Sequence, residues 1–198
     1  MGPTSSVNQQ GNKIHTLTPT IGSVSDLFGK LERELRRAFH HRNFTHKADH
    51  LYNFCVTAHA MKDHFFEAKN IIAASEKQSY NKIWNQFPEL VAASEIANSA
   101  KHFVLRESRH PQLPKGVQTK SVHQTASGIA HVFVTNSGDY KVEIEPDAPD
   151  YTIKLLDGRM QGLYEFMDFT AKYWQTFLSE QNLLLTKQSL EDLFGAEQ

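Results

Sequence analysis

Residues 160–182 read MQGLYEFMDFTAKYWQTFLSEQN and carry the strongest helical periodicity in the chain. A wide, mostly apolar stripe recurs every three to four positions along this stretch and consists of Leu163, Phe166, Met167, Thr170, Tyr173, Trp174, Phe177 and Leu178. An amphipathic helix produces this spacing because about 3.6 residues complete one turn. The stretch therefore predicts a long C-terminal helix with one broad buried face.

The same spacing predicts four further helices upstream, over about 24–42, 46–76, 79–86 and 88–105. Ser23 and Asp26 form a variant of the capping box at the first helix. Thr45 is placed to cap the second helix, and Pro88 suits the first turn of the fourth, where a missing N–H costs nothing. Together with the C-terminal helix, these segments predict a helical bundle.

The spacing of apolar residues changes from a helical pattern to a strand pattern between about 128 and 157. Residues 129–134 and 140–144 flank Asn136-Ser137-Gly138-Asp139, which is a hairpin signal, and residues 151–156 suit a third strand. We therefore predict an α+β, mainly α protein. Its helical bundle carries a three-stranded antiparallel β-meander inserted before the last long helix.

The chain of 198 residues suits one domain. We expect that domain to span 23–185, between a flexible N-terminal tail at 1–22 and a C-terminal tail at 186–198. Apolar residues make up 39% and charged residues 22%, which is enough to build a core. The net charge of −1 argues against a dedicated polyanion binder of high pI.

Cys55 is the single cysteine, so no internal disulfide can form. This composition favours a reducing compartment, and we predict a cytoplasmic protein in which Cys55 is a small buried residue. No apolar run approaches the roughly 20 residues needed to span a bilayer, so no membrane segment is expected.

The best candidate for a chemical site lies on the fourth predicted helix. Its residues Glu95, Asn98 and His102 have spacings that place them on one helix face, and Lys101 lies beside them. A carboxylate, an amide and an imidazole beside a seam of small residues would form a polar site. The alternative is a hydrogen-bonded polar strip that fixes the register of the helix.

The second predicted helix offers His59 and Asp63, one turn apart. If this helix packs antiparallel to the fourth, the pair would face Asn98 and His102. A carboxylate beside an imidazole fixes its tautomer and makes it a better base. A purely structural His–Asp bond is the alternative.

His46 and His50 have a helical spacing that can hold a transition metal. Lys47, however, stands where a hydrolytic zinc motif has glutamate. We therefore predict neither a metal nor a cofactor, and keep a metal-dependent hydrolase as a second alternative. The first helix also carries a basic stripe, with Arg33, Arg36 and Arg37, that could contact phosphates.

Asn98-Ser99-Ala100-Lys101-His102 is similar to the Asn-x3-His part of the Arg-Asn-x3-His motif of the HEPN superfamily, with Ala97 in the position of the arginine. Arg36 and His41 give a second match to the Arg-x4-His spacing. The resemblance implies a compact, frequently dimeric helical domain. Many members are metal-independent ribonucleases of toxin–antitoxin, CRISPR and phage-defence systems. The chain also resembles uncharacterised bacterial proteins with His-x3-Asp and Ala-Asn-x2-Lys-His stretches.

The function that we place first is a non-catalytic, HEPN-like module that dimerises or binds a partner. A metal-independent ribonuclease of a toxin or phage-defence system is the alternative. In that reading His102 is the general base or acid, Asn98 and Lys101 hold the phosphate, and His59 and Asp63 support them. The expected partners are a second copy of the chain and either RNA or another protein.

Overall fold

The computed structural model describes residues 6–7, 13–14, 20–99, 121–134 and 140–184. Its helices are α1 (Val24–His40), α2 (Phe44–Ala68), α3 (Ala74–Trp84), α4 (Pro88–Ser99) and α5 (Leu163–Glu180). Its strands are β1 (Ser6–Val7), β2 (Lys13–Ile14), β3 (Ser121–Val134), β4 (Tyr140–Lys154) and β5 (Met160–Gly162). The prediction of a mainly helical protein with a small antiparallel sheet is confirmed.

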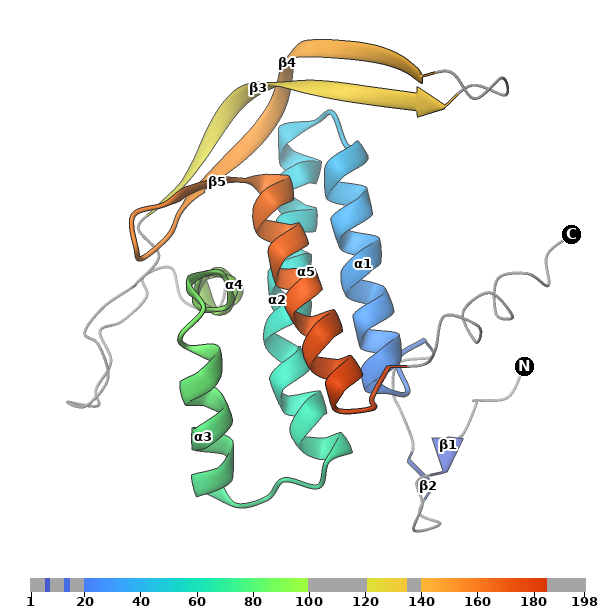
Figure 1. Cartoon of the computed structure of the whole chain (residues 1–198), viewed down its shortest axis with the longest axis vertical. Coiled ribbons are helices and arrows are strands. Elements are labelled where there is room, and N and C mark those ends of the chain that lie inside the picture. Colours follow the sequence, from blue (N-terminus) through green and yellow to red (C-terminus); the bar gives the residue numbers. More distant parts are fainter. Residues whose placement is uncertain (1–5, 8–12, 15–19, 100–120, 135–139, 185–198) are drawn as a thin grey trace, which may run out of the picture.

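Helices α1, α2 and α5 pack lengthwise, and α3 and α4 complete the bundle beside α2 (Figure 1). The stripe that defines α5 lies in the core, where Phe166, Trp174 and Leu178 are fully buried. Aromatic rings from three helices meet there: Phe65 of α2 contacts Trp84 of α3 and Phe177 of α5. Burying such rings removes a large apolar area from water and holds the helices together.

Helix α2 is shorter than the sequence predicts, because it ends at Ala68 instead of near residue 76. Asn70 adopts a left-handed conformation with φ of 54°, and the N–H of Ile71 donates to the carbonyl of Phe66 at 2.8 Å. This is a Schellman end, which stops a helix and satisfies its last carbonyls. At the other end the side chain of Asn43, and not Thr45, caps the helix.

The prediction of the three-stranded meander is wrong in where it places the strands. The second and third predicted strands are one strand, β4, which runs through Pro146 and Pro149. The third strand of the sheet is β5, three residues that were predicted to begin the last helix. Pro149 is accommodated because β5 pairs with β4 only at 152–154, so the strand is an edge there. Pro146 falls at a break in register opposite Ser127/Ile129.

The sheet is therefore a long two-stranded ribbon held at its base. The Tyr151 hydroxyl donates to the Phe44 carbonyl at 3.0 Å, and Ile153 and Leu155 are fully buried. The rest of the ribbon runs out past the end of the bundle at which α1 leads into α2 (Figure 1).

Most residues of the predicted tails, and residues 100–105 of the fourth predicted helix, lie outside the described ranges. Within those ranges, no helix combines the length and the apolar character that a membrane crossing requires.

Candidate functional sites

The structure places three of the five predicted site residues. His59 and Asp63 lie on α2 and Asn98 lies on α4, whereas Lys101 and His102 fall outside the described residues. His59 and Asn98 are half-buried and Asp63 is exposed. In the described part of the chain Asp63 forms no hydrogen bond or ion pair, so the expected His59–Asp63 pair is not observed. Asp63 instead lines a pocket where α2 gives way to α3.

A polar contact between α2 and α4 comes from Lys62, which is not among the predicted site residues. Its amine donates to the Ser94 hydroxyl at 3.2 Å and lies 5.7 Å from the centre of the Trp84 ring. Burial lowers the pKa of Lys62 to about 8. A signal was available, because Lys62 lies four residues from each of the buried residues Ala58 and Phe66 and so shares their helix face.

A histidine cluster lies beside a buried carboxylate between α1 and α2, and one of its members, His50, contacts that carboxylate. Glu34 is 4% exposed, and its two oxygens contact Nδ1 of His50 at 2.8 Å and a guanidinium nitrogen of Arg37 at 3.0 Å. The ring of His41 lies 4.8 Å from that of His46 and 5.2 Å from that of His50, measured between centroids. Loss of hydration, together with the nearby charges of His46, His50 and Lys47, lowers the pKa of His41.

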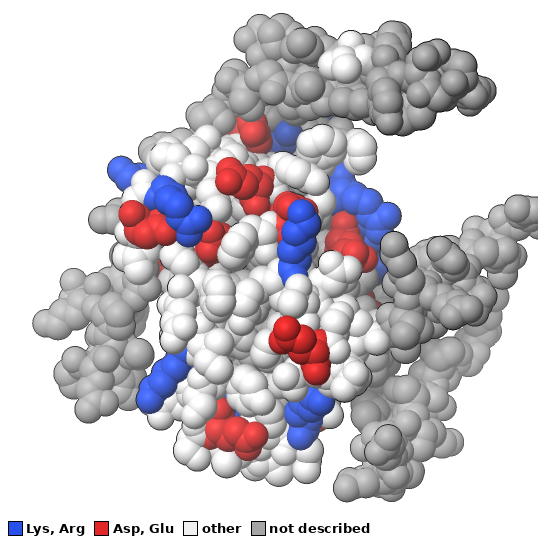
Figure 2. Space-filling model, viewed as in Figure 1, with Lys and Arg blue, Asp and Glu red and all other residues white. Residues whose placement is uncertain are grey.

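This arrangement bears on the metal alternative and on the basic stripe of the first helix. Among the described residues, no group of three or more histidine, cysteine or carboxylate side chains is placed to hold a metal ion. His50 is instead bonded to Glu34. Arg37, which belongs to the basic stripe, forms an ion pair with Glu34. Its charge is therefore already partly neutralised by a carboxylate of the protein. Figure 2 shows basic and acidic side chains interspersed on the visible face, with no broad area of one sign.

Cys55 is fully buried, as expected, and burial raises the pKa of its thiol. A buried thiol with a raised pKa holds little of the thiolate that nucleophilic chemistry needs. Cys55 is therefore a core residue of α2.

The β-ribbon presents an open edge along β3 that the helical and hairpin patterns of the sequence do not predict. The strand order is β3-β4-β5, so β3 has one side without a neighbour among the described strands. The 14 residues of β3 include no Lys, Arg, Asp, Glu or Pro. The paired strand β4 carries charged residues and both prolines: Lys141, Glu143, Glu145, Pro146, Asp147, Pro149, Asp150 and Lys154.

Comparisons with protein-family models, curated proteins and solved structures gave no significant match to the chain. The geometry of the described residues is therefore the basis for assigning a function.

Proposed function

We propose that this protein is a homodimerising helical module in which β3 of one copy pairs with β3 of a second copy. The observation that supports the proposal is the outer edge of β3, which has no neighbouring strand in the part of the chain that the structure describes. In an antiparallel pair of strands, the residues alternate between sending their N–H and C=O groups to the neighbour and to the opposite side. An edge strand therefore presents a row of backbone groups that can bond another chain.

Proteins normally protect such an edge with charges, proline, bulges or a covering element. The lack of charge and proline in β3 leaves its 14 residues open to pairing over about 46 Å. A register irregularity at Gly128 divides this edge into two segments. The outer side of β4 is less suited to pairing, because Pro146 and Pro149 lack an N–H and charged residues lie around them.

Two apolar side chains of the ribbon whose exposure the structure describes are open to solvent. Val122 near its base is 41% exposed, and Val142 in its far half is 56% exposed. Two strands alone are marginally stable in water, whereas three or more strands form a stable sheet more readily. Pairing β3 with its symmetry mate would give four continuous strands. It would also use the same surface on both copies, as a two-fold dimer requires.

The experiment compares two substitutions at one level of the ribbon. Val132 of β3 and Val142 of β4 are direct cross-strand partners and therefore lie on the same face. Val132→Lys puts a charge on the open strand itself, within the proposed interface. Val142→Lys puts the same charge one strand further from the proposed interface. Sedimentation velocity over a range of protein concentrations would give the dimer dissociation constant for each.

We expect a wild-type dimer that Val132→Lys weakens at least tenfold and that Val142→Lys weakens much less. A monomeric wild-type protein would rule out the proposal. Equal weakening by the two variants would mean that the copies meet through the ribbon face instead of the β3 edge. Circular dichroism of each variant would confirm that the fold is kept.

The ribonuclease alternative has less support among the described residues. Of the groups assigned to phosphate binding, Asn98 lies within the described ranges, and it is half-buried on α4. The Lys62–Ser94 contact accounts for part of the polar character of the α2–α4 boundary without any chemistry.

A further inference from the structure

A pocket of about 460 Å³ lies where α2 ends and α3 begins. Volumes of this size are typical of sites that hold a small ligand or a few side chains. The Schellman end of α2 shapes the pocket, because left-handed Asn70 turns the chain and brings Ile71 back beside Phe66. Phe66 and Ile71 are largely buried and supply apolar walls, while Ile72 at the rim is 79% exposed.

The pocket is electrostatically suited to a cation. Asp63 and Glu67 line it from one face of α2, one turn apart. Both are exposed, and neither forms an ion pair or a hydrogen bond within the described residues. Like charges at this spacing repel each other, and carboxylates near the C-terminus of a helix also oppose its dipole. A cation bound between them would relieve both effects.

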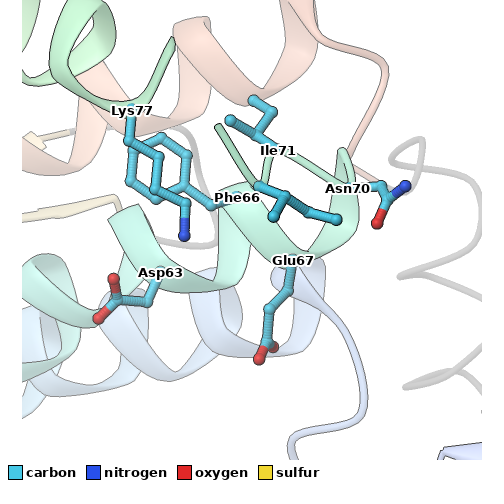
Figure 3. Close-up of a pocket in the computed structure, with 7 residues that line it drawn as sticks. Asp63, Phe66, Glu67, Asn70, Ile71 and Lys77 are labelled. Carbon is cyan, nitrogen blue, oxygen red and sulfur yellow. The ribbon is translucent and has the colours of Figure 1, made fainter. Parts of the chain in front are cut away.

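Lys77 of α3 shows how a cation fits against the pocket wall. Its amine lies 5.3 Å from the centre of the Phe66 ring, within the range of a cation–π contact. Figure 3 shows the Lys77 side chain lying along the ring, with its nitrogen towards the side on which Asp63 and Glu67 lie. The amine is not within ion-pairing distance of either carboxylate. Lys77 therefore occupies the ring face without neutralising the two acids.

We propose that this pocket binds an arginine or lysine side chain of a peptide segment that also carries a neighbouring apolar residue. The cationic group displaces Lys77 from the Phe66 ring and lies between Asp63 and Glu67. The apolar neighbour covers Ile72, whose large exposure no other described residue relieves. This site is separate from the β3 edge, and binding there does not depend on dimerisation.

The test is a titration of the ¹⁵N-labelled full chain, followed by NMR, with N-acetyl-Leu-Arg-amide. The matched neutral probe is N-acetyl-Leu-citrulline-amide, which keeps the shape of the side chain and removes its charge. We expect saturable shifts of the Asn70, Ile71 and Ile72 amides with a dissociation constant on the order of 1 mM. The citrulline peptide should bind at least fivefold more weakly.

Three variants sharpen the result. Asp63→Asn/Glu67→Gln should weaken binding of the arginine peptide at least fivefold. Glu165→Gln/Glu180→Gln removes two exposed carboxylates from α5 and should leave binding unchanged. Lys77→Met frees the Phe66 ring and should tighten binding roughly two- to fivefold, as expected for one cation–π contact.

Five results would overturn the proposal: equal binding of the citrulline peptide, shifts confined to other parts of the chain, unchanged binding by Asp63→Asn/Glu67→Gln, weakening by the α5 control, or no tightening by Lys77→Met. N-butylguanidine carries the same guanidinium and the same net charge without a peptide. If it binds as tightly as the arginine peptide, the assignment to a peptide segment is wrong.

Discussion

A guanidinium nitrogen of Arg159 lies 2.9 Å from Oε1 of Glu89, across the boundary between the sheet and the bundle. The same carboxylate oxygen accepts a hydrogen bond from Nε2 of Gln161 at 3.0 Å. Glu89 is in the first turn of α4 and is 1% exposed, while Gln161 belongs to β5. One buried carboxylate thus attaches the base of the β-ribbon to α4.

Glu89→Ala should therefore destabilise the protein more than a typical surface substitution. It leaves the buried amide of Gln161 without its acceptor and removes the partner of Arg159. We expect a loss of about 2–4 kcal/mol in the free energy of unfolding, measured with urea. Glu165→Ala, on an exposed face of α5, is the control and should change stability by less than about 0.5 kcal/mol. Comparable effects of the two variants would show that this network contributes nothing.

Lys62 should make the stability of the protein vary with pH in the alkaline range. Its pKa of about 8 in the folded protein is below the ordinary value of 10.5, because burial disfavours the charged amine. Between these values the unfolded state binds more protons, so this group makes stability rise as the pH increases from about 8 to 10.5. Lys62→Met should remove that rise and stabilise the protein at pH 7 by roughly 1–3 kcal/mol.

Urea denaturation at pH 7.5 and 9.5 would measure this effect. Lys82→Met replaces an exposed lysine of α3 and serves as the control, with no change in the pH dependence expected. A Lys62→Met protein whose stability keeps the wild-type dependence on pH would contradict the assignment of a lowered pKa to this amine.

His41 should produce a dependence of the same sign at acidic pH, where stability again rises with increasing pH. Its pKa is lowered in the folded protein, so below the ordinary value near 6.5 the unfolded state binds a proton that the folded state resists. The contribution of His41 to the free energy of unfolding is therefore fully present above that pH. It is lost as the pH decreases through the pKa of His41 in the folded protein. His41→Gln should flatten the thermal stability profile between pH 7.5 and 5. His64→Gln, on α2, is a comparison that should retain the wild-type slope.

Local patterns predicted the helices well and the sheet less well. The stripe from Leu163 to Leu178 determines α5 because burial follows the helical period. The end of α2 was missed, since Asn70 must adopt φ of 54° and asparagine does so only in a suitable context. Pro146 and Pro149 were interpreted as a connection. They remain within β4 because that part of the strand has one free edge, which is a property of the sheet and not of the local sequence.

The candidate site was harder to predict than the fold, because helical spacing does not reveal which partner a side chain meets. Asp63 has the correct spacing to pair with His59, yet it lies at the pocket beside α3. Lys62 stands next to Asp63 in the sequence, a pattern that is typical of a solvated surface. Its contact with Ser94 depends on how α2 crosses α4.

Tyr151 provides the last prediction, which concerns how firmly the ribbon is held. Its hydroxyl donates to the Phe44 carbonyl. Its ring packs edge-on against the Phe44 ring, with 5.7 Å between the ring centroids. Tyr151→Phe keeps the ring contact and removes the hydrogen bond, so it should cost about 0.5–1.5 kcal/mol in stability. Amide exchange in β4 should become faster, because local opening of the ribbon base requires less free energy. Tyr164→Phe, with an exposed ring on α5, should leave both quantities unchanged. If the two variants behave alike, the ribbon is held by the burial of Ile153 and Leu155 and not by the Tyr151 hydrogen bond.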